Sequence, residues 1–456
     1  MKNMSLDQIA KSCNGVYIGS EEEKKNCVNG ITIDSRKIEQ GNLFVAIKGE
    51  RVDGHTFVEG AYEKGAICCL VEEAPEHVNG PYIKVKSCQQ AIKDIAEYYR
   101  QSLNIKVVGI TGSVGKTSTK EMIASVLEQK YSVQKTQGNF NNEIGVPLTI
   151  FGIREEHQVA VLEMGISDFG EMHRLSKMVR PDIAVMTNIG LCHLENLKSR
   201  DGILQAKSEI FDFAKDSCVA VLNGDDDKLV TLHERETLNP KFYGLDESND
   251  IYAMNLEDKG LEGIVCDICT DEEKINVWIP IPGMHMVYNA LAGAQVGLEL
   301  GLTMEEIKAG IEALKPTGGR NNLLKVNNML VIDDCYNANP ISMRSSLDVL
   351  AKASGRTVAV LGDMGELGED ERKLHYEVGE YAAKHNIDLL ICVGTLCKDM
   401  KNGAESVKAS RTKILYFETR ELLLEKIHQL VEEGDTILVK ASHFMKFEQV
   451  VDELKK

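Results

Sequence analysis

The chain has 456 residues, of which 43% are hydrophobic and 27% charged, and its formal net charge at pH 7 is −18. This length predicts several domains, each able to bury its own core. The acidic balance argues against nucleic acid or an anionic membrane surface as the main partner, because both require a basic surface. No apolar run approaches the length of a membrane span, and the start of the chain lacks the apolar segment of a signal peptide.

The cysteines indicate a reducing compartment. The chain has 12 of them, scattered without the spacing of a disulfide framework, so we expect a cytoplasmic protein. Cys266 and Cys269 form a Cys-x-x-Cys pair, but a zinc site needs four ligands and no second pair follows. The alternation in VCDIC favours a half-buried strand instead.

The pattern along the chain predicts an α/β protein with three domains. Residues 1–103 mix short strands and helices, as in a small mixed α/β domain. Residues 104–316 alternate helical stretches with the apolar runs KVVGIT, VAVLEM, IAVMTNI and CVAVLNG, which are typical of buried parallel strands. A hinge candidate, PTGG, follows, and residues 317–456 contain MLVIDDC, TVAVLGD, DLLICVG, KILYF and TILVKAS. This second block predicts a Rossmann-like parallel sheet.

The segment GITGSVGKTSTKE at residues 109–121 predicts a phosphate-binding loop of the Walker A type. It lies between an apolar strand and a helix, so backbone N–H groups of the turn and of the helix N-terminus would face the phosphates. Lys116 adds a positive charge, and Thr117 offers a hydroxyl to Mg²⁺. Ile110 stands where the pattern usually has its first glycine. The alternative is a glycine turn that binds nothing.

Glu163 and His193 follow two of the apolar runs. A carboxylate at the C-terminal end of a buried parallel strand can bind Mg²⁺ directly or through water, and Glu163 has this position. A solvated acid at a strand end fits Glu163 equally well. For His193, the more common role is that of a hydrogen-bonded structural histidine.

Lys207 lies on the apolar side of the predicted helix GILQAKSEIFDFA. A lysine in such surroundings is costly unless it is neutral or has a partner. A neutral amine can react with CO₂, and the resulting carbamate would supply an anionic oxygen to Mg²⁺. The more common arrangement is a snorkelling stem with its ammonium in water.

Together these residues resemble the Mur ligases, the family that builds the peptidoglycan peptide. The shared pattern consists of the Thr-Gly-Ser-x-Gly-Lys-Thr loop, Glu163, His193, Lys207 and the segment GMHMVYNAL. It extends over nearly the whole chain through IDSRKIEQGNLFVAIKGERVDGHTF, TQGNFNNEIGVPLT, VIDDCYNANPISM and VLGDMGELG. Within the family, the pattern is most similar to the ligase that adds D-alanyl-D-alanine to UDP-N-acetylmuramoyl-tripeptide.

The resemblance implies an ATP-dependent amide ligase in peptidoglycan precursor synthesis. The terminal carboxylate of the tripeptide would attack the γ-phosphorus of ATP to give an acyl phosphate, and the amine of D-Ala-D-Ala would then displace phosphate. Two Mg²⁺ ions and Lys116 would offset the charge crowded around the phosphate. We expect a cytoplasmic monomer with these two small-molecule substrates, and no nucleic acid or membrane partner.

The resemblance also implies the roles of individual residues. Those expected in catalysis are Lys116, Glu163, His193 and Lys207. Those expected to bind ATP are Thr111, Gly112, Ser113, Val114, Gly115, Lys116, Thr117, Asn289, Arg320 and Asp334. Those expected to bind the UDP substrate or to line the cleft are Ser35, Arg36, Thr136, Asn141, Asn142, Tyr336, Asn337 and Asn339. Those expected to bind Mg²⁺ are Thr117 and Glu163 for one ion, and His193 and carbamylated Lys207 for the other.

The chain departs from the family pattern at a few positions. Met286 stands where much of the family has Asn, which affects one adenine-side contact. Ala441 and His443 lie where relatives often have Lys-Gly-Ser-Arg. A histidine is mostly neutral at pH 7 unless it is paired, so the sequence does not assure a fixed cationic contact at His443. The cluster from Tyr336 to Asn339 has an alternative role as a turn that ends at Pro340.

Other functions remain as alternatives. The nearest is another Mur-type ligase that adds a single amino acid or glutamate, as folylpolyglutamate synthase does. The segments DDCYNANP and GDMGELG argue against it. A GTPase switch predicts an Asn-Lys-x-Asp motif, which the sequence lacks. A non-enzymatic assembly protein would not need a lysine such as Lys207 on an apolar face.

Overall fold

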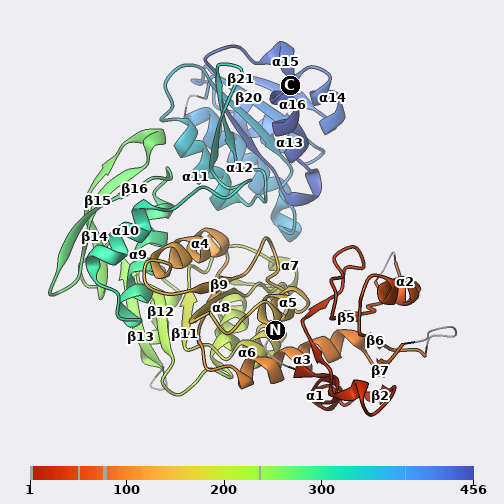
Figure 1. The fold of residues 1–456 in the computed structure, drawn as a ribbon. Coiled ribbons are helices and arrows are strands. Elements are labelled where there is room, and N and C mark those ends of the chain that lie inside the picture. Colours follow the sequence, from red (N-terminus) through yellow and green to blue (C-terminus); the bar gives the residue numbers. More distant parts are fainter. Residues whose placement is uncertain (1–3, 50–51, 75–79, 236–237, 386) are drawn as a thin grey trace. The chain divides into compact units, whose positions relative to one another are not determined.

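The computed structural model describes residues 4–49, 52–74, 80–235, 238–385 and 387–456 (Figure 1). The chain divides into two compact units. Unit 1 comprises residues 1–111, 130–185 and 207–220, and unit 2 comprises residues 112–129, 186–206 and 221–456. None of the helices in the described ranges has both the length and the apolar character that a bilayer crossing requires.

The first part of unit 1 forms the small mixed α/β domain that its sequence predicts. Its main sheet has the order β2-β7-β6-β5-β4, in which β4 to β7 run parallel and β2 is antiparallel to β7. Ser5 and Ser87 cap the helices α1 and α3. The elements are β1 (Met4–Ser5), α1 (Leu6–Ser12), β2 (Val16–Ile18), β3 (Cys27–Val28), β4 (Gly30–Thr32), β5 (Asn42–Val45), α2 (Val58–Glu63), β6 (Cys68–Val71), β7 (Tyr82–Lys84) and α3 (Cys88–Ser102).

The strands β5 and β6 form the centre of this sheet, and each is buried along its whole length. Phe44 of β5 and Cys69 of β6 pack in one cluster with Val58 and Ala61 of α2. Continuous burial is expected for parallel strands that are covered on both faces, which explains why FVA and CCLV read as unbroken apolar runs.

Unit 1 also carries strands of the predicted central domain, in the order β11-β8-β10-β9. The strands β8 and β10 run parallel, with Ile110 opposite Glu163. Every residue of β10 is buried, including its last residue, Glu163. The helix α3 packs against α5 and α6. The elements are β8 (Lys106–Thr111), β9 (Val133–Lys135), α5 (Gly145–Phe151), β10 (Val159–Glu163), α6 (Glu171–Val179) and β11 (Ile183–Met186).

Unit 2 carries further strands of the central domain, in the order β16-β15-β14-β13-β12. The strands β14, β15 and β16 form an antiparallel meander, which adds to the parallel pattern that the sequence predicts. Cys266 and Cys269 are buried free thiols in β15, so the strand prediction for VCDIC is confirmed. The elements are β12 (Val219–Asn223), β13 (Asn239–Gly244), β14 (Ile251–Asp258), β15 (Ile264–Cys269) and β16 (Lys274–Ile279).

The helix α4 (Lys116–Leu127), which follows the predicted phosphate loop, packs against α9 (His285–Glu299) and α10 (Met304–Glu312) in unit 2. Glycines permit the close approach of these helices. A Cβ on Gly310 would lie 2.4 Å from the Cα of Val126, and a Cβ on Gly293 would lie 3.0 Å from Cγ of Met122. The position of α4 therefore depends on small residues in α9 and α10.

The last part of unit 2 confirms the Rossmann-like sheet. Its order is β17-β18-β22-β19-β20-β21. The strands β18, β22, β19, β20 and β21 run parallel, and β17 is an antiparallel edge strand. The elements are β17 (Asn322–Val326), β18 (Met329–Asp333), α11 (Pro340–Leu350), β19 (Thr357–Gly362), α12 (Glu371–Lys384), β20 (Leu389–Val393), α13 (Cys397–Glu405), β21 (Lys413–Phe417), α14 (Arg420–Leu424), α15 (Ile427–Leu430), β22 (Thr436–Lys440) and α16 (Glu448–Leu454).

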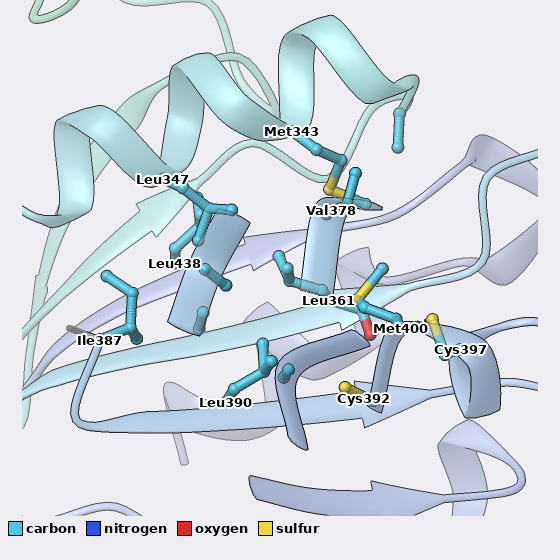
Figure 2. Packing of buried hydrophobic residues seen from close by; sticks show 14 of the residues in the cluster. Met343, Leu347, Leu361, Val378, Ile387, Leu390, Cys392, Cys397, Met400 and Leu438 are labelled. Atoms are coloured by element: carbon cyan, nitrogen blue, oxygen red, sulfur yellow. Dashed lines mark hydrogen bonds between the residues drawn. The ribbon is translucent and has the colours of Figure 1, made fainter. Parts of the chain in front are cut away.

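Both faces of this sheet are buried. Leu361 and Leu438 face a core formed with α11, α12 and α13, and Figure 2 shows Met343 of α11 gathered with them. The alternate residues Val360 and Val439 face a second core formed with α14, α15 and α16. Because successive side chains of a strand point to opposite faces, two covered faces require apolar residues at every position.

The packing of α10 against α4 predicts that Gly310→Ala is destabilising. The new methyl group would meet the backbone of Val126, so the helices must separate, at a cost of about 1–3 kcal/mol. The matched control is Gly60→Ala in α2, where a Cβ would meet nothing within 4 Å. That change should be neutral or stabilising by about 0.5–1 kcal/mol. Thermal unfolding followed by circular dichroism checks both, and equal melting temperatures for the two variants would contradict this view of α4.

Candidate active site

The predicted phosphate loop in unit 2 leads directly into α4. Gly112 and Gly115 have positive φ angles of +147° and +86°, and Gly115 is the N-cap of α4. A Cβ on Gly112 would lie 1.9 Å from Oγ1 of Thr187, so only glycine fits there. Lys116 folds back over the turn, and its ammonium donates a hydrogen bond to the Gly112 carbonyl at 2.8 Å. A glycine turn, a helix N-terminus and a cation are features that phosphate sites use, and they lie together here.

Residues 187–190, which follow β11, brace this turn from unit 2. The side-chain oxygen of Asn188 accepts from the Val114 N–H at 3.0 Å, and its amide nitrogen donates to the Val114 carbonyl at 3.1 Å. The hydroxyl of Thr187 donates to the same carbonyl at 2.6 Å. The Ser113 hydroxyl accepts from the Gly190 N–H at 2.9 Å. The sequence interpretation missed these braces, although a polar Thr-Asn pair at the end of the apolar run IAVMTNI was their signal.

Asn289 of α9 contacts α4 through Thr119 and is 5% exposed. Its side-chain oxygen accepts from the Thr119 hydroxyl at 2.8 Å, and its amide nitrogen lies 3.2 Å from Sδ of Met286. Met286 is the residue that departs from the family pattern. The structure thus places Asn289, predicted to bind ATP, in contact with the helix that carries the loop.

His193 precedes the short helix α7 (Leu194–Leu197) and has a left-handed φ of +50°. Its Nδ1 lies 2.8 Å from Oε2 of Glu366, a residue of the GDMGELG segment. The hydrogen bond from His193 holds the pKa of the Glu366 carboxyl below its usual value, and the charge of Lys116 acts in the same direction. His193 is therefore hydrogen-bonded, as the sequence predicted for a histidine at this position. Its partner, Glu366, could not be identified from the sequence.

Asp334 forms a buried polar group with Lys440. The Lys440 ammonium lies 2.5 Å from Oδ2 of Asp334 and donates to the Asn337 carbonyl at 3.1 Å. The Ser346 hydroxyl donates to the same carboxylate oxygen at 2.6 Å. This charge-assisted network fixes the end of β18, and it engages a residue that we predicted to bind ATP.

The remaining predicted residues of the C-terminal sheet lie at its loops. The Arg320 guanidinium lies over the Tyr336 ring at 4.2 Å, and the Tyr336 and His443 rings are 5.5 Å apart. Asn339 is the N-cap of α11, and its side-chain oxygen accepts from the Ser342 N–H at 2.9 Å. The turn that the sequence offered as an alternative is therefore present around Asn339.

In unit 1, Glu163 is held by two of the predicted substrate residues. Its N–H donates to the Thr136 hydroxyl at 3.0 Å, and its Oε1 accepts from the Asn141 amide at 2.8 Å. The Gly165 N–H donates to the Asn141 carbonyl at 2.8 Å. Glu163 is 2% exposed, so the alternative interpretation of Glu163 as a solvated acid at the strand end is wrong. A buried, oriented carboxylate of this kind suits a hard cation.

Three other predicted residues of unit 1 have local partners. Asn142 accepts from the Gly145 N–H at 2.8 Å and so shapes the start of α5. The Arg36 guanidinium forms two hydrogen bonds of 2.9 Å with the carboxylate of Asp34, which lowers the pKa of Asp34 to about 2. The Ser35 carbonyl accepts from Lys64 at 2.8 Å. Arg36 remains 84% exposed and accessible to a ligand.

Lys207 lies in the last turn of α8 (Arg200–Ser208) and is 0% exposed. The snorkelling arrangement is therefore wrong for this lysine, since its amine does not reach water. The hydroxyl of Thr111, also in unit 1, is buried and has no hydrogen-bond partner among the described residues.

The structure brings the predicted residues together in separate groups. In unit 1, Thr136, Asn141 and Glu163 form one network. In unit 2, residues 112–117 form the braced loop, and Asp334 and Asn337 share Lys440. Sequence reasoning missed four residues that each support a predicted residue: Thr187, Asn188, Ser346 and Glu366. All but Ser346 come from a distant part of the chain.

Sequence models of the Mur ligases match the chain in three successive segments. They are the Mur ligase family catalytic domain at residues 27–108, the Mur ligase middle domain at 110–297 and the Mur ligase glutamate ligase domain at 319–443. The chain is 38% identical over 461 residues to the UDP-N-acetylmuramoyl-tripeptide–D-alanyl-D-alanine ligase of Bacillus subtilis, covering 100% of this chain and 99% of that protein.

Solved structures agree with this result. The MurF structure from Acinetobacter baumannii has a TM-score of 0.89 at 32% identity and covers 99% of each chain. The MurF ligase of Thermotoga maritima in complex with ADP has a TM-score of 0.80 at 30% identity and covers 93% of this chain and 97% of that one.

The bracing of the loop predicts that Asn188→Ala weakens nucleotide binding. The variant leaves the Val114 N–H without its side-chain partner and leaves the Val114 carbonyl with the Thr187 hydroxyl alone, at a cost of about 1–3 kcal/mol, which corresponds to about 5–150-fold in the Kd of ADP. Calorimetric titration with ADP measures this, and Asn402→Ala on the exposed side of α13 is the matched control. Unchanged affinity in Asn188→Ala would mean that the brace does not control the loop.

Proposed function

This chain belongs to the Mur ligase family, and we propose that it joins D-alanyl-D-alanine to UDP-N-acetylmuramoyl-tripeptide in peptidoglycan precursor synthesis, with ATP as the energy source. The tripeptide carries diaminopimelate or lysine as its third residue. The observation that carries this proposal is the full-length similarity to ligases of that specificity, and the hydrogen-bonded glycine turn at the start of α4 supports it. No enzyme nucleophile is required, because the phosphoryl group activates the acid.

ATP binding belongs to residues 111–117. Positive φ angles at Gly112 and Gly115 orient the turn, and the N-terminus of α4 favours an anion. Lys116 supplies a point charge for the β- and γ-phosphates. Asn289, Arg320 and Asp334 complete the nucleotide site in this proposal, and Ser35, Arg36, Thr136, Asn141, Asn142, Tyr336, Asn337 and Asn339 serve the UDP substrate and the cleft.

The residues assigned to Mg²⁺ have the donor chemistry that this ion requires. The Thr117 hydroxyl and the Glu163 carboxylate are oxygen ligands, and the Asn141 amide fixes the orientation of Glu163. These two residues are assigned to one ion, and His193 and carbamylated Lys207 to a second. When bound, Mg²⁺ offsets the negative charge between an anionic nucleophile and an anionic phosphate.

The chemistry follows from the charges. A carboxylate and an amine do not condense at neutral pH, because oxide is a poor leaving group. The terminal carboxylate of the tripeptide attacks the γ-phosphorus, ADP leaves, and an acyl phosphate forms. The amine of D-Ala-D-Ala attacks the acyl carbon, and the tetrahedral intermediate loses phosphate and a proton to give the amide. Lys116 stabilises the charge that accumulates on the phosphoryl oxygens.

The proposal includes the organisation and the cellular context of the protein. The domains are residues 1–103 for the UDP substrate, 104–316 for ATP and 317–456 for the Rossmann-like part. All 12 cysteines are free thiols, which suits a reducing cytoplasm. The protein acts as a monomer on two small molecules, and its net charge of −18 disfavours nucleic acid and anionic membranes as partners.

Phosphate release tests the proposed reaction directly. With ATP, Mg²⁺ and UDP-N-acetylmuramoyl-tripeptide, we expect sustained phosphate release only when D-Ala-D-Ala is present. A panel of D-Ala-D-Ala, single amino acids and glutamate distinguishes this activity from that of other Mur-type ligases. Faster turnover with a single amino acid or with glutamate would replace the proposed substrate.

The role of Lys207 predicts that Lys207→Ala lowers kcat by at least about a hundredfold, because an anionic ligand of the second ion is lost. Added acetate or formate should restore part of the activity by occupying the space of the carbamate. Lys177→Ala, a half-exposed lysine paired with Glu97, is the control and should retain full activity. Full activity in Lys207→Ala would remove the carbamate from the mechanism.

A further inference from the structure

The contact between His193 and Glu366 settles which ring nitrogen of His193 is protonated. The distance from Nδ1 to Oε2 is 2.8 Å, which is a hydrogen bond. An ionised carboxylate oxygen can only accept, so Nδ1 carries a proton, and in the neutral ring Nε2 keeps its lone pair. Nε2 is therefore the atom of His193 that can bind a cation.

The loop that carries Glu366 is anchored at the two residues that precede Glu366. It spans residues 362–368, between β19 and α12. The Met364 N–H donates to Nε2 of His375 at 2.9 Å, and the Gly365 N–H donates to the Ser442 hydroxyl at 2.9 Å. These residues come from α12 and from the end of β22, so two separate elements fix the backbone immediately before Glu366.

A cluster of Asp363, His375 and Cys397 lies behind this loop, with ligand-type atoms within 4.8 Å of one another. Its atoms already have partners. Nε2 of His375 accepts from Met364, its Nδ1 donates to the Glu371 carbonyl at 2.6 Å, and the Asp363 carboxylate accepts from the Cys397 N–H at 2.8 Å. Burial lowers the pKa of His375, which keeps the ring neutral and able to accept. The cluster is therefore an anchor of the loop rather than a metal site.

The backbone is strained at both ends of the contact. Glu366 has φ +62° and His193 has φ +50°, a left-handed conformation that non-glycine residues seldom adopt. Strain of this kind persists where the surrounding structure enforces it, and it concentrates at functional sites.

We propose that Glu366 is a positioning residue for His193, which holds Nδ1–H and thereby presents Nε2 to the second Mg²⁺. Metal-binding histidines in general donate their other N–H to a carboxylate or a carbonyl, and this partner fixes the tautomer and the ring orientation. The inference rests on the proposed function, because that proposal assigns His193 to the ion. The C-terminal sheet thus supplies a part of the metal site through a loop that binds no ion itself.

The competing explanation is an exposed ion pair without consequence. The Glu366 side chain is 68% exposed, and exposed ion pairs often contribute nothing measurable. An inert pair predicts no effect of Glu366 on metal binding, whereas a positioning residue acts on the metal and acts only through His193. These expectations separate in two experiments.

The first experiment measures Mn²⁺ binding by electron paramagnetic resonance, with a non-hydrolysable ATP analogue and without peptide substrates. Glu366→Ala should weaken the His193-dependent Mn²⁺ site by about 10–100-fold. Glu366→Gln should lose less, because the amide oxygen still accepts from Nδ1–H. Glu369→Gln, which changes an exposed carboxylate in the helical turn that follows this loop, is the matched control and should bind Mn²⁺ as the wild type does.

The second experiment is a double-mutant cycle with His193→Ala. Glu366→Ala should lower kcat and weaken Mn²⁺ binding in the wild-type background and should add nothing further in the His193→Ala background. Mn²⁺ affinity equal to the wild type in Glu366→Ala, or an effect that is undiminished in His193→Ala, would overturn the proposal. Because the Mn²⁺ measurement uses no D-Ala-D-Ala, a wild-type protein that binds Mn²⁺ but forms no peptide would refute the proposed function and leave this inference testable.

Discussion

The hydrogen bonds that the side chains of Thr187 and Asn188 make with the backbone of Val114 are the interaction on which the rest of the site depends. The chain carries a net charge of −18, and its reaction must bring two further anions together. Long-range attraction cannot do this, so the anions must meet local donors in fixed positions. The brace holds the turn between Gly112 and Gly115 in one conformation, and Lys116 already lies over that turn.

The helix layer of unit 2 extends this preorganisation. The position of α4 depends on the close approach that Gly310 permits, and the Thr119 hydroxyl ties α4 to Asn289 of α9. Any change that moves α4 also moves Lys116 and Thr117 at its N-terminus. Met286, although it departs from the family pattern, contacts Asn289 and so takes part in this support. The carboxylate of Glu163 in unit 1 is oriented in a comparable way, by the Asn141 amide.

The sequence predicted the elements that depend on local pattern. Alternation of apolar runs and helices identified the parallel sheets, and the loop at residues 109–121 was recognised from the order of its residues. Sequence could not decide whether Lys207 snorkels or is buried, because periodicity gives the side of a helix but not the depth of the layer above it. The structure answers this question with an amine that is 0% exposed. The partners of Val114 and His193 were also missed, since Asn188 and Glu366 lie far away in the chain and pairing across such separations leaves no local signal.

The central claim is that the γ-phosphoryl group of ATP is transferred to the terminal carboxylate of the tripeptide before the amine attacks. The most direct test uses UDP-N-acetylmuramoyl-tripeptide labelled with ¹⁸O in that carboxylate and mass analysis of the phosphate released with D-Ala-D-Ala. Passage through an acyl phosphate transfers one ¹⁸O atom to phosphate for each peptide bond formed. Peptide formation that releases phosphate without ¹⁸O would contradict the account.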